Sequence, residues 1–192
     1  YDKGFNEYLE AAKLIKSQRN DVEFQRLGAI DSGNPSGVPQ SVVEDAVSNG
    51  FINYLGTTSD VLPIIGEADC MVLPSYREGI SRVLMEAASM EKPIIATNVT
   101  GCREVINDGE TGFLCKVKSP VDLAHKMAKI INMTEKEKVV MGQKGRVKVI
   151  EEMDLEKIID IYDYKIAAVL GEEEGITVDL QELISLRKTK KI

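Results

Sequence analysis

Apolar runs and helical patterns alternate along the chain, and one such alternation organises the rest. The run at positions 70–73 (CMVL) predicts a buried strand, and the run from Pro93 to Ala96 predicts a second one. Between them lie a polar loop and a helical pattern, and this order of elements is that of a βαβ unit. In such units ligands bind beyond the carboxyl ends of the strands, and phosphates bind at helix N-termini.

The same alternation extends to both sides of this unit. Further strands are predicted at 22–28, 50–56 and 112–115, and further helices over 5–20, 40–49, 59–65, from Ser119, from Thr134 and over 154–170. Ser119 followed by proline, and Thr134 followed by Glu137, are typical helix N-caps. Strands that alternate with helices predict an α/β fold, doubly wound around a mostly parallel, Rossmann-like sheet.

Two carboxylates bracket the start of the central helix. Glu78 lies in the loop and Glu86 about two turns into the helix, with seven residues between them. Eight helical positions return to nearly the same face, roughly 12 Å further along the axis. A carboxylate accepts hydrogen bonds from two neighbouring hydroxyls, so the pair could hold the sugars at either end of a diphosphate. Taken alone, however, two glutamates are explained more simply as a loop charge and a solvated helix residue.

The residues between the two carboxylates suit a phosphate. The backbone amides of Gly79, Ile80 and Ser81 would face the phosphates at the start of the helix. Gly79 lets the backbone approach a ligand closely, and the Ser81 side chain is expected to cap the helix.

The whole stretch resembles a family pattern. PSYREGISRVLMEA, followed by EKPIIATNVTGCREVINDGETGFL, resembles the donor-site signature of retaining glycosyltransferases of the GT-B fold, the "glycosyl transferases group 1" or family 4 type. The resemblance runs over about residues 2–170. It rests on the Glu78 and Glu86 pair together with the preceding Pro-Ser, Gly101 and the turn at 109–113. It implies that this chain is the carboxyl-terminal, donor-binding half of a GT-B enzyme, and that the amino-terminal acceptor domain is absent from it.

The resemblance also implies roles for individual residues. Glu78 would approach hydroxyls of the transferred sugar and Lys3 would contact the diphosphate, and these are the catalytic candidates. Glu86 would hold the nucleotide ribose. Arg77 lies in the same signature and is grouped with the donor-binding residues. The base would lie against the segment that contains Ile52, held by backbone groups and apolar packing.

The implied reaction is transfer of a sugar from a nucleoside diphosphate sugar, expected to be a UDP-sugar, to an acceptor hydroxyl with retention at the anomeric carbon. Capsule, lipopolysaccharide or other glycan synthesis is the expected setting, with a glycan or lipid-linked acceptor held by the missing domain. Neither a cofactor beyond the nucleotide sugar nor a metal is expected. A GT-B enzyme of another type, such as a sugar-nucleotide epimerase, a non-catalytic nucleotide-sugar-binding module and an unrelated doubly wound domain remain alternatives.

Composition and charge bear on the partners, the domain organisation and the location of the protein. The 192 residues carry a net charge of −7, which argues against nucleic acid as a partner, and fit a domain at 1–170 with a helical or disordered tail at 171–192. Three cysteines, an odd number, favour reduced thiols in a cytoplasmic protein. The lone His125 lies in a helical pattern, away from any metal-binding cluster. The basic positions 187–191 would allow peripheral contact with the inner face of a membrane.

Overall fold

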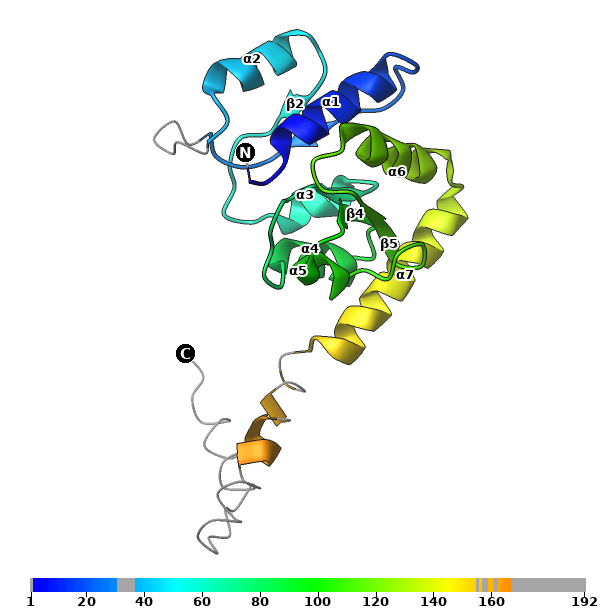
Figure 1. Ribbon diagram of the computed structural model, residues 1–192. Coiled ribbons are helices and arrows are strands. Elements are labelled where there is room, and N and C mark those ends of the chain that lie inside the picture. The colour runs from blue at the N-terminus through cyan, green and yellow to red at the C-terminus, as the bar shows by residue number, and fades with distance from the viewer. Residues whose placement is uncertain (1, 31–36, 155, 157–158, 161, 167–192) are drawn as a thin grey trace, which may run out of the picture. The chain divides into compact units, whose positions relative to one another are not determined.

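The structure is a computed structural model that describes residues 2–30, 37–154, 156, 159–160 and 162–166 (Figure 1). The chain divides into two compact units, Tyr1–Val149 and Ile150–Ile192, and each is taken by itself. The first unit contains the five strands of the described residues. In the second, residues 156, 159–160 and 162–166 are helical, within the helix predicted over 154–170. The predicted domain boundary at 170 and the predicted tail at 171–192 lie outside the described residues.

Every strand pair in the described part of the chain is parallel, as predicted. The first sheet pairs β1 (Gln25–Arg26) with β2 (Asn53–Tyr54). The second has the order β3 (Met71–Leu73), β4 (Ile94–Thr97), β5 (Gly112–Cys115). The helices are α1 (Phe5–Lys16), α2 (Gln40–Ser48), α3 (Leu62–Glu67), α4 (Arg82–Ser89), α5 (Thr100–Arg103), α6 (Pro120–Asn132) and α7 (Glu135–Glu152). The α/β prediction is therefore confirmed.

The predicted strand at 22–28 is reduced to the two residues of β1. Neither residue of this strand is buried, so the alternation that defines a half-buried strand is weak there. The backbone pairing nevertheless extends beyond the two residues, since Asn53 N–H donates to the Phe24 carbonyl at 2.7 Å and Leu55 N–H donates to the Arg26 carbonyl at 2.9 Å. The Arg26 guanidinium lies 5.1 Å from the Phe5 ring centroid, which anchors this strand to α1.

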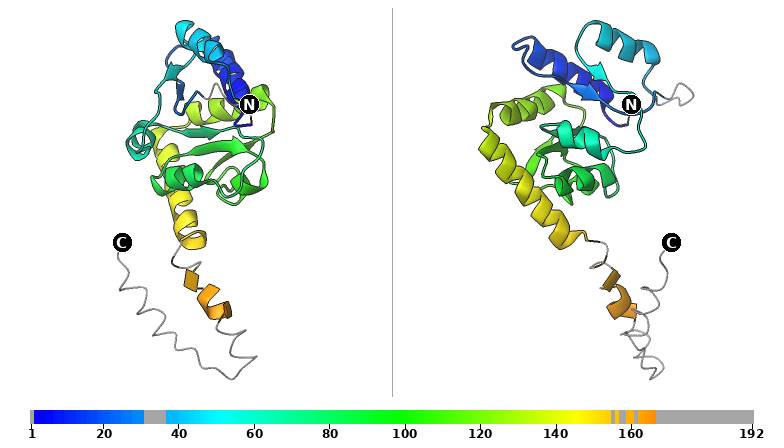
Figure 2. Two further views of the ribbon diagram at one scale, coloured as in Figure 1. Left: turned by 90° about the vertical axis from the view of Figure 1, so that its left-hand side faces the viewer. Right: turned by 180° about the vertical axis from the view of Figure 1, so that it is seen from behind.

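The centre of the larger sheet is the most buried part of the chain. All four residues of β4 are buried, as expected for the middle strand of a sheet covered on both faces. Helix α4 packs against β3 and β4, whereas α6 packs against β4, β5 and α1. Figures 1 and 2 show α6 on one face of this sheet and α4 with α5 on the other. Because the three strands are parallel, the carboxyl ends of β3, β4 and β5 meet at one edge of this sheet.

Two helix starts match their predictions. The Ser119 hydroxyl accepts a hydrogen bond from the Asp122 amide at 3.3 Å, and Pro120 occupies the first turn of α6. At the start of α7 the Thr134 hydroxyl accepts from the Glu137 amide at 3.3 Å, and the Glu137 carboxylate accepts from the Thr134 amide at 2.7 Å. This reciprocal pair is the predicted capping box.

Candidate functional site

Most of the residues that the sequence singled out lie at the carboxyl edge of the larger sheet. The loop 74–81 leads from β3 into α4, and the segment before α1 runs beside it. Tyr76 N–H donates to the Asp2 carbonyl at 2.8 Å. At Gly4 (φ 70°) an added Cβ would lie 2.0 Å from the Pro74 carbonyl oxygen, so a side chain has no room there. The segment before α1 is therefore in direct contact with the backbone of the loop.

This contact brings together two of the predicted residues. The Lys3 ammonium donates to Glu78 Oε1 at 2.6 Å, although the two residues are 75 positions apart in the sequence. The Lys3 side chain is 70% exposed, whereas that of Glu78 is 10% exposed. The carboxylate is thus enclosed by protein while the ammonium remains open to an approaching anion.

The second carboxylate lies on α4, as predicted. Helix α4 begins at Arg82, so Glu78 stands in the loop before the helix and Glu86 in its second turn. The Arg82 guanidinium lies 3.7 Å from Glu86 Oε1, with side-chain exposures of 88% and 32% respectively. Glu86 therefore remains accessible to a ligand, and the charged partner that it has among the described residues is a solvent-exposed arginine.

The start of α4 is open. An added Cβ at Gly79 would meet nothing within 4 Å, and Ile80 is 61% exposed. The predicted side-chain cap is wrong, because Ser81 occupies the N-cap position but its side chain makes no capping hydrogen bond. A capping box is unavailable here, since Leu84, at the position where a glutamate or glutamine would reach back, is apolar and buried.

Helix α5 packs against the backbone of the loop 74–81 on the side that faces the protein. An added Cβ at Gly101 would lie 1.5 Å from the Gly79 carbonyl oxygen and 2.7 Å from that of Glu78, so only glycine allows this approach. The buried Thr97 hydroxyl, at the end of β4, donates to the Ser75 carbonyl. The loop is consequently held in place by β4 and α5 on its protein side.

The three thiols of the chain are not suited to nucleophilic chemistry. Burial, with a smaller contribution from the Glu78 charge, raises the pKa of the Cys102 thiol to about 11. Burial likewise raises the pKa of Cys70 and of Cys115 to about 12. All three are free cysteines, as the sequence suggested, and remain protonated at neutral pH.

Two further predicted residues are placed differently from the main group. The Arg77 side chain is 87% exposed and pairs with Asp2 at 3.6 Å, so it lies on the outer surface of the loop. Ile52 is 4% exposed and belongs to the hydrophobic core. Its side chain is therefore committed to packing, and a contact of Ile52 itself with a base would have to involve its backbone.

Sequence patterns alone assign no special role to Glu7. Its Oε1 accepts a hydrogen bond from the Tyr76 hydroxyl at 2.7 Å, across 69 positions of sequence. An acidic residue in the first turn of a helix is ordinarily explained by the helix dipole, so nothing in the local pattern indicated this contact.

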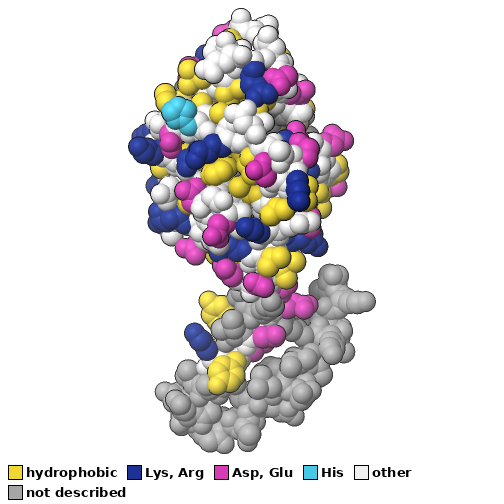
Figure 3. All heavy atoms as spheres, turned by 90° about the vertical axis from the view of Figure 1, so that its right-hand side faces the viewer, with side chains coloured by type: hydrophobic (Ala, Val, Ile, Leu, Met, Phe, Trp, Pro, Cys, Tyr) yellow, Lys and Arg dark blue, Asp and Glu magenta, His cyan; other side chains and the backbone are white. Residues whose placement is uncertain are grey.

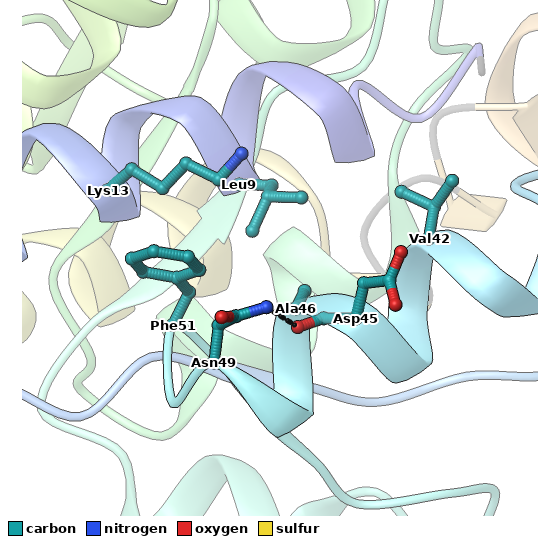
Figure 4. Close-up of a pocket in the computed structure, with 7 residues that line it drawn as sticks. All are labelled: Leu9, Lys13, Val42, Asp45, Ala46, Asn49 and Phe51. Carbon is teal, nitrogen blue, oxygen red and sulfur yellow. Dashed lines mark hydrogen bonds between the residues drawn. The ribbon is translucent and has the colours of Figure 1, made fainter.

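A small hollow lies elsewhere, between α1 and α2 (Figure 4). It has a volume of about 180 Å³ and includes Leu9, Ala46 and Phe51 in its lining. Asn49, on its rim, donates its side-chain amide to the Asp45 carbonyl at 2.7 Å. Small-molecule sites usually occupy about 300–1,000 Å³, and none of the predicted site residues lines this hollow. The candidate site is the open carboxyl edge rather than this hollow.

Three further observations on the described residues concern metal ions, membranes and nucleic acid. No group of three His, Cys, Asp or Glu residues that could hold a metal ion occurs among them. No helix within the described ranges is long and apolar enough to span a membrane. On the face drawn in Figure 3, basic and acidic side chains are interspersed around the exposed His125. That face offers no continuous basic surface of the kind that binds nucleic acid.

Comparison with known proteins decides the family. The model of the family "Glycosyl transferases group 1" matches residues 1–133. The chain belongs to this family. The capsular polysaccharide biosynthesis glycosyltransferase CapM of Staphylococcus aureus is 29% identical over 174 residues, which are 91% of this chain and 45% of CapM. The chain thus spans about half the length of this relative.

Solved structures give the same result for the fold. The structure of Anabaena HepE in complex with UDP matches 87% of this chain and 46% of HepE, with a TM-score of 0.76 and 19% identity. The carboxyl-terminal domain of a group 1 glycosyltransferase, LpcC from Francisella tularensis, matches 80% of this chain and 81% of that domain, with a TM-score of 0.65 and 24% identity. These neighbours are GT-B glycosyltransferases, and the fold prediction is confirmed.

Proposed function

We propose that this chain binds a UDP-sugar and forms the donor-binding half of a retaining glycosyltransferase. The observation that carries the proposal is the meeting of Lys3 and Glu78 at 2.6 Å beside the open start of α4. This arrangement puts an exposed cation, a helix N-terminus and an enclosed carboxylate at the edge where α/β folds bind ligands. The UDP complex of the structurally similar HepE supports the choice of nucleotide.

The leaving diphosphate is the group that most needs stabilisation. Lys3 would bind it with its exposed ammonium, because Lys3 can turn from Glu78 toward an anion without losing buried contacts. The amides of Gly79 and Ile80 lie just before α4 and would add the partial positive charge of the helix start. Both groups oppose the negative charge that grows on the diphosphate as the glycosidic bond breaks.

The two carboxylates would bind the sugars on either side of the diphosphate. Glu86 would accept hydrogen bonds from the two ribose hydroxyls, and in doing so would exchange its exposed contact with Arg82. Glu78 would accept from hydroxyls of the transferred sugar and place its negative charge near the anomeric carbon. Since Glu78 is 10% exposed, its charge acts where water screens it little.

The acceptor would be a hydroxyl of a glycan or of a lipid-linked sugar, presented by a second domain. Relatives such as CapM act in capsular polysaccharide synthesis, and we place this chain in that kind of pathway. The proposed reaction includes no metal, because Lys3 and the start of α4 would offset part of the negative charge of the diphosphate.

Calorimetric titration of the 192-residue chain with UDP, GDP and ADP tests the proposal. UDP is expected to bind most tightly, and Lys3→Ala to weaken it about ten- to 150-fold, as expected for loss of a hydrogen bond to a charged group. Lys13→Ala is the matched control, since Lys13 lies on α1 and pairs with Glu10 at 2.8 Å. Absence of nucleotide binding, or equal effects of the two substitutions, would contradict the proposal.

Retention and transfer require a complete enzyme. In a transferase that carries this sequence after its acceptor domain, NMR of the product should show the same anomeric configuration as in the UDP-sugar. Inversion would exclude the retaining assignment, and a product with altered sugar stereochemistry but no transfer would favour an epimerase.

A further inference from the structure

Three segments of the candidate site meet at Tyr76. Its backbone amide donates to the Asp2 carbonyl at 2.8 Å, and its hydroxyl donates to Glu7 Oε1 at 2.7 Å. On its ring lies the Lys118 ammonium, 5.0 Å from the ring centroid, from the loop between β5 and α6. Tyr76 is also two positions before Glu78, so each of these contacts acts on the loop that carries the enclosed carboxylate.

Among the described residues, the Tyr76 hydroxyl is the hydrogen-bond donor to the Glu7 carboxylate. Glu7 Oε2 is buried and accepts no hydrogen bond from the described residues. The hydroxyl of Tyr76 therefore supplies a bond that this partly buried carboxylate depends on, since a buried charge without partners is costly. Burial, together with the hydrogen bond to Glu7, raises the pKa of Tyr76 to about 12, so the phenol stays a donor at neutral pH.

Further contacts also hold the segment before α1 and the loop 74–81 in place. The backbone of Gly4 lies against the Pro74 carbonyl, and Arg77 pairs with Asp2 at 3.6 Å. Lys118 adopts a left-handed conformation (φ 56°), which is unfavourable for a residue other than glycine and persists where surrounding contacts hold it. The Lys3 backbone is thus flanked by fixed residues, while its side chain remains exposed.

We propose that Tyr76 is a positioning residue for donor binding, which holds the segment of Lys3 against the loop of Glu78. The proposal rests on the proposed function, because it assigns the diphosphate to Lys3 and the transferred sugar to Glu78. A lysine side chain is flexible, so its grip on a phosphate depends on where its backbone is held. Tyr76 sets that position before the ligand arrives, which lowers the entropy lost on binding.

A purely structural role for Tyr76 makes a different prediction. If Tyr76 acts through Lys3, removing its hydroxyl should matter only while Lys3 is present. If it acts on overall stability alone, its removal should have the same effect on nucleotide affinity with or without Lys3. A double-mutant cycle separates the two.

The first experiment measures UDP affinity of the 192-residue chain by calorimetry for Tyr76→Phe, Lys3→Ala and the double variant. Tyr76→Phe should weaken UDP about tenfold, and the double variant should bind as Lys3→Ala does. The matched control is Tyr8→Phe on α1, next to Glu7. Its hydroxyl donates to the Gln25 carbonyl at 2.9 Å, and its removal should leave UDP affinity unchanged. Additive effects, or unchanged affinity in Tyr76→Phe, would overturn the proposal.

A second measurement needs no ligand. The Tyr76 amide, bonded to the Asp2 carbonyl, should exchange its hydrogen at least about tenfold faster in Tyr76→Phe and at the wild-type rate in Tyr8→Phe. Unchanged exchange in Tyr76→Phe would overturn the positioning role. If the wild-type chain failed to bind UDP, the proposed function would fail, and hydrogen exchange alone would decide whether Tyr76 holds the two segments together.

Discussion

Replacing Glu78 by glutamine should separate nucleotide binding from sugar transfer. Glutamine keeps the shape of the side chain but removes the charge that pairs with Lys3 at 2.6 Å. The substitution therefore frees the Lys3 ammonium and removes a negative charge from beside the proposed diphosphate site. We expect the affinity for free UDP to be maintained or increased, and the rate of transfer to fall.

The exposures in the structure set the magnitudes. Because the Lys3 side chain is 70% exposed, solvent screens the pair, and its loss is worth at most about 1 kcal/mol, or a gain in UDP affinity of up to about fivefold. Glu78 itself is 10% exposed, so the hydrogen bonds that we propose between it and a sugar would be those of a shielded charge. Their loss, at about 1.5–3 kcal/mol, should lower kcat about ten- to 150-fold.

Two assays test this difference. Calorimetry with UDP on the 192-residue chain gives the affinity, and steady-state kinetics of the complete transferase with its sugar donor gives kcat and KM. Glu110→Gln, which changes an exposed carboxylate in the turn before β5, is the control. A loss of UDP affinity as large as the loss of kcat would place Glu78 on the nucleotide and refute the assignment. Unchanged kcat would show that the carboxylate does not face the reacting sugar.

The remaining predictions concern the same unit. Glu86→Ala should weaken UDP and a UDP-sugar equally, by about 1.5–3 kcal/mol, and calorimetry that shows unchanged UDP affinity would contradict the ribose contact. Gly101→Ala should lower the free energy of unfolding by about 1–3 kcal/mol, because its Cβ would lie 1.5 Å from the Gly79 carbonyl oxygen. Gly79→Ala, where an added Cβ meets nothing within 4 Å, should leave the unfolding free energy unchanged but weaken UDP, and equal thermal shifts in the two glycine variants would refute this contrast. Thr134→Ala removes the hydroxyl that caps α7 and should cost about 1 kcal/mol, or about 3 °C in melting temperature; an unchanged melting temperature would show that the cap adds no net stability.

Much of the secondary structure and the outline of the site follow from the sequence. The buried strand β4, the caps at Ser119 and Thr134 and the position of Glu86 within α4 all depend on residues close together in the chain. Periodicity and capping reflect hydrogen bonds and burial within one turn or one strand, which local sequence encodes. The resemblance to the donor-site signature also proposed Lys3 as a member of the candidate site.

Only the tertiary structure decided which of these residues touch. The ion pair between Lys3 and Glu78 and the bond from Tyr76 to Glu7 join positions 75 and 69 residues apart, and both depend on how the segment before α1 lies along the loop after β3. Local sequence carries no record of such contacts, because strand order and packing set them. The side chain of Ile52, in the segment predicted to lie against a base, is taken up by the core for the same reason.

Gly79 and Gly101 show most clearly which features of the site local sequence does not determine. Gly79 and Gly101 both belong to the recognised signature, and their neighbours in the sequence do not reveal which of them faces protein. In the fold, the α5 backbone at Gly101 presses on the Glu78–Gly79 loop, while Gly79 faces open space at the start of α4. The sequence determined that glycine stands at both positions. Packing between α5 and the loop determined that Gly101 lies against the backbone of the loop, while Gly79 leaves room for a ligand.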